Sequence, residues 1–117
     1  MTTGWPGSVP DPFTVESVDS GAWWCRLVLS GEFDLEGSRL FRQAVSDAVG
    51  RGRRHLAVDA AGVTFVDSSA LAALLHARTD VLDVGGTFRL TAVSGPVARL
   101  LEIAALTDEL LDKRQGT

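Results

Sequence analysis

The chain has 117 residues, of which 45% are hydrophobic and 22% are charged, values typical of a globular domain with a buried core. Its formal net charge of −4 disfavours direct binding to nucleic acid, because nucleic-acid-binding domains usually present a basic face. A single cysteine, Cys25, excludes an internal disulfide and cannot complete a zinc cluster with only two histidines. We therefore expect one domain in a reducing, cytoplasmic compartment, with neither a metal nor a cofactor.

The two ends of the chain are predicted to lie outside the domain. Residues 1–12 contain several glycines and prolines, which predicts a flexible arm, and Trp5 is the one residue there that could anchor onto a surface. Residues 112–117 are predicted to be a polar tail, so that the domain occupies 13–111. No signal peptide is recognisable, and the longest apolar run, 70–75, is far shorter than the roughly 20 residues of a membrane span. We expect no membrane insertion.

The domain is predicted to open with a β-hairpin. Strands are expected at 13–18 and 23–30, because the turn residues Asp-Ser-Gly separate them at 19–21. In the second strand, apolar side chains recur at every other position from 23 to 29, which indicates one buried face. The connection is so short that the two strands should pair with each other.

Strands and helices alternate after the hairpin. Apolar residues recur at helical spacing from Leu40 to Val49, and glycines at 50 and 52 end that helix. Alternation of this kind predicts an α/β fold with a mixed central sheet of about four to five strands and about three to four helices. The further elements expected are a strand at 56–60, a central helix at 69–84, a strand at 87–92, a helix that begins at Pro96 and a short edge strand at 108–111.

A basic cluster follows the first predicted helix and consists of Arg51, Arg53, Arg54 and His55. Cations at a helix C-terminus complement the helix dipole, so a solvated helix end accounts for the cluster. A docking patch for an acidic partner is the alternative.

The segment Asp67-Ser68-Ser69 joins an apolar strand-like stretch to the alanine-rich central helix. Aspartate and serine cap helix N-termini, since their side-chain oxygens accept free backbone N–H groups. Both serines should therefore lie at the positive end of the helix dipole. The segment could be a helix cap and nothing more, or it could place a serine for reversible modification.

Three aspartates, Asp34, Asp59 and Asp67, could meet at one edge of the sheet and bind Mg²⁺, as a small phosphotransfer enzyme would require. The glycine-rich loops that bind nucleotide phosphates are absent, and Ser69 lacks the Gly-x-Ser-x-Gly context of a nucleophile. We therefore expect the chain not to be an enzyme.

Taken together, residues 13–111 resemble a STAS domain of the anti-sigma factor antagonist family. The Asp-Ser-Ser segment in this context is the specific part of the resemblance, and each remaining piece alone is weak. The matching stretches are Leu29-Ser-Gly-Glu-Phe-Asp34, Leu56-Ala-Val-Asp59, Val63-Thr-Phe-Val-Asp-Ser-Ser69, Gly85-Gly86 and the closing helix from Val97 to Leu106.

The resemblance implies a phosphorylation switch. In that family an anti-sigma factor that is also a serine kinase phosphorylates a serine at the start of the central helix, and the matching position is Ser69, with Ser68 as the less favoured neighbour. Asp34 and Asp67 match acidic positions around the phosphorylation site and the kinase interface. The unphosphorylated chain, a monomer or weak dimer, would bind the anti-sigma factor and free a sigma factor for transcription, and a serine phosphatase would reverse the mark.

The chain departs from the family at one position, because Ala70 stands where a glycine usually follows the serine pair. Its methyl group could hinder the approach of the kinase backbone. Some STAS domains are never phosphorylated and act as scaffold or accessory subunits of larger complexes, for example in lipid transport, and this is the alternative function that the resemblance leaves open.

Overall fold

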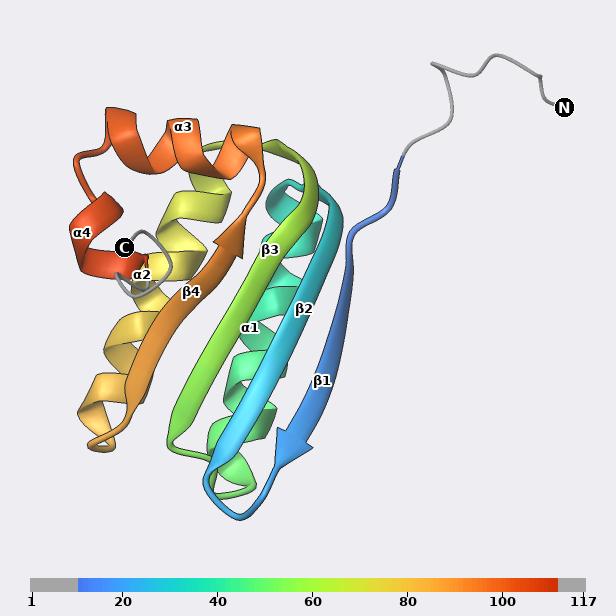
Figure 1. Cartoon of the computed structure of the whole chain (residues 1–117). Helices are drawn as coiled ribbons and strands as arrows, with labels where there is room; N and C mark the ends of the chain where they lie inside the picture. Colours follow the sequence, from blue (N-terminus) through green and yellow to red (C-terminus); the bar gives the residue numbers. More distant parts are fainter. Residues whose placement is uncertain (1–10, 112–117) are drawn as a thin grey trace, which may run out of the picture.

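The computed structural model describes residues 11–111 (Figure 1). The predicted arm up to residue 10, with Trp5, and the predicted tail at 112–117 lie outside the described residues. The elements in chain order are β1 Thr14–Ser20, β2 Trp24–Phe33, α1 Leu35–Gly50, β3 His55–Val66, α2 Ser68–Asp83, β4 Thr87–Val93, α3 Gly95–Ile103 and α4 Thr107–Leu110.

The sheet has four strands in the order β1-β2-β3-β4. The first pair is antiparallel and the other two pairs are parallel, which confirms the predicted α/β fold with a mixed sheet that opens with a hairpin. Helices α1 and α2 cover one face of the sheet, α3 crosses the end at which β3 and β4 finish, and α4 lies beside β4 (Figure 1). No helix within residues 11–111 is long and apolar enough to cross a membrane.

The core lies between the sheet and the α1–α2 layer. Cys25, Leu27 and Leu29 are buried, as their alternation predicts, whereas Trp23 is 60% exposed because it lies in the turn before β2 begins. On α2, the small side chains of Ala70, Ala73 and Ala77 are buried and let the helix approach the sheet closely. The largest fully buried side chains include Phe33, Phe41, Phe88, Leu56, Leu74 and Leu90.

Two predictions about strands are wrong. Strand β3 does not end near residue 60 but continues to Val66, because Asp59 forms an ion pair with Arg26 (2.9 Å) on the helix-free face and does not interrupt the strand. Most of the expected edge strand at 108–111 belongs to helix α4. Only Leu111 forms an isolated parallel bridge, to Leu90.

Candidate functional site

The carboxyl ends of the neighbouring parallel strands β2 and β3 bring two aspartates together. Phe33, the last residue of β2, pairs with Val66, the last residue of β3. Asp34 and Asp67 follow these two residues directly and become the N-caps of α1 and α2. The strand register therefore places two capped helix N-termini side by side.

Asp67 organises the start of α2. Its Oδ1 atom accepts hydrogen bonds from the backbone N–H groups of Ser69 (2.9 Å) and Ala70 (3.3 Å). The same oxygen accepts a short hydrogen bond of 2.5 Å from the Ser69 hydroxyl. The segment is thus a helix cap, as predicted, with Asp67 as the capping residue and Ser68 as the first helical residue.

Asp34 caps α1 through a hydrogen bond from the Gly37 backbone N–H to its Oδ1 atom (2.9 Å). In the first turn of that helix, Ser38 is only 5% exposed. Its hydroxyl lies 2.8 Å from the Asp34 carbonyl oxygen and 3.2 Å from Ser69 Oγ, and it can donate to either. Ser38 therefore links the two helix starts.

Ser69 and its neighbour differ in their surroundings. The Ser69 hydroxyl is half-buried and oriented between Asp67 and Ser38, whereas Ser68 is exposed. Ser38 was not identified as a site residue from the sequence. Its position four residues after the Asp34 cap is a signal for it, because a serine there can donate a hydrogen bond to the carbonyl oxygen of the cap residue.

Ala70 does not obstruct this site. Its side chain is 0% exposed and belongs to the core beneath α2. The methyl group is therefore not part of the surface that a partner would approach in the free chain.

The expected convergence of three aspartates is wrong. Asp59 lies within β3, where Arg26 neutralises its carboxylate, and it does not reach the strand ends. Within residues 11–111, no cluster of three or more His, Cys, Asp and Glu side chains could hold a metal ion. The two remaining aspartates act as helix caps.

The predicted basic cluster is bound to other parts of the fold. Arg51 and Arg53 both contact the Asp19 carboxylate, at 2.9 and 3.0 Å, and tie the β1–β2 turn to the end of α1. Their hydrogen bonds, with Arg51 first, hold the pKa of Asp19 far below its usual range. Arg54 lies against the carbonyl oxygens of Val49 and Arg53. These contacts favour a structural role over a docking patch.

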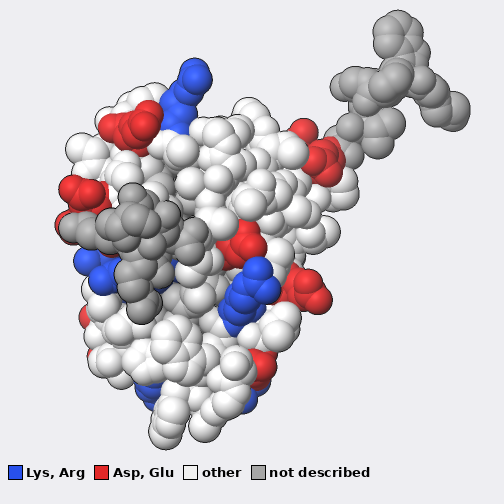
Figure 2. All heavy atoms as spheres, in the orientation of Figure 1, with Lys and Arg blue, Asp and Glu red and all other residues white. Residues whose placement is uncertain are grey.

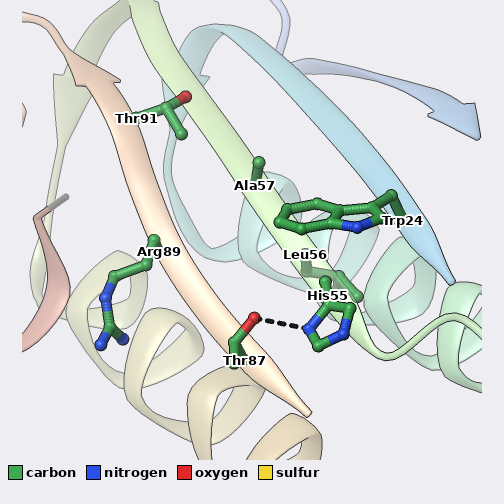
Figure 3. A pocket seen from close by; sticks show the side chains of 7 residues that line it. All are labelled: Trp24, His55, Leu56, Ala57, Thr87, Arg89 and Thr91. Atoms are coloured by element: carbon green, nitrogen blue, oxygen red, sulfur yellow. Dashed lines mark hydrogen bonds between the residues drawn. The ribbon is translucent and has the colours of Figure 1, made fainter. Parts of the chain in front are cut away.

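On the helix-free side, the charged side chains of the described residues include the Arg26–Asp59 ion pair. In Figure 2, the visible acidic and basic side chains on this side are small spots interspersed with uncharged residues, and some spots of opposite charge adjoin. A shallow cavity of about 350 Å³ lies over the beginnings of β3 and β4. Trp24 is 50% exposed at its rim and packs on His55, whose Nδ1 lies 2.9 Å from Thr87 Oγ1 (Figure 3). This cavity is at the opposite end of the strands from Ser69.

Comparisons with known proteins identify the family of this chain. The family model described as "Mlab, STAS domain" matches residues 16–112. An anti-sigma F factor antagonist of Paenibacillus polymyxa is 32% identical over 79 residues, which are 67% of this chain and 68% of that protein. The chain therefore belongs to the STAS domain family.

Solved structures share the fold. An anti-sigma factor antagonist from Mycobacterium paratuberculosis matches with a TM-score of 0.74 at 22% identity, over 87% of this chain and 86% of the other. The anti-sigma factor antagonist SpoIIAA in its unphosphorylated form gives 0.74 at 19% identity, over 85% and 87% of the two chains. The phosphorylated form of the Bacillus protein gives 0.69 at 19% identity, over 85% and 90%.

Proposed function

We propose that this chain is an anti-sigma factor antagonist that phosphorylation switches. In its unphosphorylated form it binds an anti-sigma factor with serine kinase activity, and the sigma factor held by that partner is released to direct transcription. The observation that carries the proposal is the Ser69 hydroxyl, which Asp67 and Ser38 orient between two capped helix starts. The names of the similar proteins support the same function.

Ser69 is the phosphate acceptor in this proposal. Its Oγ atom attacks the γ-phosphorus of ATP held by the kinase, the Oγ–P bond forms and ADP leaves with the electrons of the broken P–O bond. The hydroxyl proton leaves on a base at the kinase–substrate interface. Asp67 accepts that hydroxyl hydrogen in the resting chain, which directs the oxygen lone pairs away from the carboxylate. Ser68 is exposed and has no such orientation.

The phosphate acts on the interface rather than on the fold. It adds about −1.5 to −2 charge at pH 7. The α2 N-terminus accommodates an anion within the domain, but a docked partner surface would have to desolvate the new charge beside the two capping carboxylates. A loss of about 2.8 kcal/mol at the interface weakens binding about a hundredfold. A serine phosphatase restores the binding form.

Incubation with the cognate kinase and ATP, followed by mass spectrometry, tests the acceptor assignment. Phosphate is expected on Ser69, and Ser69→Ala should abolish incorporation. In calorimetry with the anti-sigma factor, Ser69→Ala should bind like the wild type, while Ser69→Asp should bind about a hundredfold more weakly. Ser68→Asp is the matched control, since it adds the same charge one residue away, and a smaller loss is expected.

Equal affinities of Ser69→Ala and Ser69→Asp would contradict the switch. Intact binding without any phosphate on Ser68 or Ser69 would instead identify the chain as a non-phosphorylated scaffold subunit of a larger complex.

A further inference from the structure

A groove runs along the seam between α1 and α2 and begins at Ser69. Its first part has a volume of about 250 Å³, and Ser38 and Ser69 lie together in its wall. A second hollow of about 330 Å³ continues the seam toward Asp80. Arg39 and Arg42 line both parts, so the two hollows share their cationic wall.

These two arginines differ from most others in the chain. Within residues 11–111, Arg39, Arg42 and Arg99 are the arginines whose side chains make no hydrogen bond or ion pair with another residue of that range. Two of the three face one groove in a chain of net charge −4. Guanidinium groups bind phosphate through charge-assisted and often bidentate hydrogen bonds.

The hydrogen bonds of Ser69 determine on which side a phosphate would lie. Phosphorylation removes the hydroxyl hydrogen that Ser69 donates to Asp67, and the phosphate is then repelled by that carboxylate. On the other side, the Ser38 hydroxyl lies 3.2 Å from Ser69 Oγ and can donate to a phosphate oxygen. Ser38 opens onto the groove that Arg39 and Arg42 line. The path away from Asp67 therefore leads into the groove that the two arginines line.

We propose that Arg39 and Arg42 form an internal receptor for the phosphoryl group of phosphorylated Ser69 and hold it in the α1–α2 groove. The proposal rests on Ser69 as the modified residue and adds what happens to the phosphate afterwards. Occupied in this way, the groove changes from a cationic surface to a neutral or acidic one. The modification then alters the seam between the helices as well as the end of α2.

The receptor can be tested without the kinase. Phosphoserine is inserted at position 69 during translation, and the pKa of its second ionisation, about 6 for a free phosphoserine, is measured by ³¹P NMR. The double variant Arg39→Gln/Arg42→Gln should raise that pKa by about 0.5 to 1, because it removes two neighbouring cations. Each single variant should give part of the rise. The comparison cancels the influence of Asp67, which is present in every sample.

Two matched controls make the result specific. Arg99→Gln removes an arginine on α3 that does not line the groove and should leave the pKa unchanged. Phosphoserine at position 68, outside the groove lining, should titrate identically with and without the two arginines. An unchanged pKa at position 69 in the double variant would overturn the receptor, and so would an equal rise at position 68. Failure of the kinase to modify Ser69 would count against the proposed function and not against this titration.

Discussion

The two ends of the parallel strands use their charged side chains in different ways. Where β3 begins, Arg51 and Arg53 converge on Asp19, and the opposite charges satisfy one another. Where β2 and β3 end, Asp67 orients a serine hydroxyl, and the neighbouring Arg39 and Arg42 make no contact of this kind within residues 11–111. Charged side chains that pair with each other hold elements of the fold together. Charged side chains without such a contact can bind a ligand or a modified residue.

The largest expected effect on stability is at the end of the sheet where the parallel strands begin. A Cβ atom on Gly86 would lie 2.0 Å from the Arg54 carbonyl oxygen, which is backbone and cannot turn aside. Gly86→Ala should therefore lower the free energy of unfolding by about 3 kcal/mol, as measured by urea denaturation. Gly50→Ala is the control, because a methyl group there meets nothing within 4 Å and should stabilise α1 by about 0.5 to 1 kcal/mol. Similar effects of the two variants would show that this end is more adaptable than its contacts indicate.

The next largest effect on stability concerns the two helix caps at the end of the sheet where β2 and β3 finish. Asp67 accepts three hydrogen bonds through Oδ1, whereas the Asp34 side chain accepts one. Asp67→Ala should cost about 2 kcal/mol and Asp34→Ala about 1 kcal/mol, again by urea denaturation. Asp67→Asn, which keeps an acceptor for the backbone groups, should recover part of the loss. A larger cost at Asp34 would place the main anchor of the site on α1.

The smallest effect concerns the Asp19 contacts, whose contribution to stability is present at neutral pH and is lost in acid. Because the two arginines lower the pKa of Asp19 in the folded chain, its ionised form stabilises the fold above the pKa of about 3.9 that aspartate has in unfolded chains. That contribution is lost progressively as the pH falls below this value. Between about pH 5 and pH 3, the urea midpoint of the wild type should therefore drop more steeply than that of Asp19→Asn. Asp83→Asn, at an exposed aspartate, should keep the wild-type slope.

The order of strands and helices could be predicted because each element has a local pattern. Alternation marks β2, helical spacing marks α1, and Asp67 with its serines marks the start of α2. The identity of the aspartates that meet could not be predicted in this way, since strand register decides it. In the sequence Asp59 follows an apolar stretch much as Asp67 does, but β3 passes through Asp59 and continues to Val66.

The fate of the arginines also depends on tertiary structure. Arg51 and Arg53 follow a helix in the sequence, and only the position of the β1–β2 turn supplies Asp19 as their partner. Ser38 and Ser69 are far apart in the chain, so their contact follows from the packing of α1 on α2. Neither contact could be predicted from local sequence patterns.

The pairing of Phe33 with Val66 has a consequence for how this chain can change in evolution. The β2–β3 register shifts twice before that pair, so β3 uses two more residues than β2 to reach the same level. Deleting a residue between Asp59 and Val66 would move Asp67 along the strand by about 3.3 Å relative to Asp34. Insertions and deletions should therefore be tolerated in the turns at the other end of the sheet and excluded from β2 and β3. The lengths of these two strands determine how the starts of α1 and α2 are placed relative to each other.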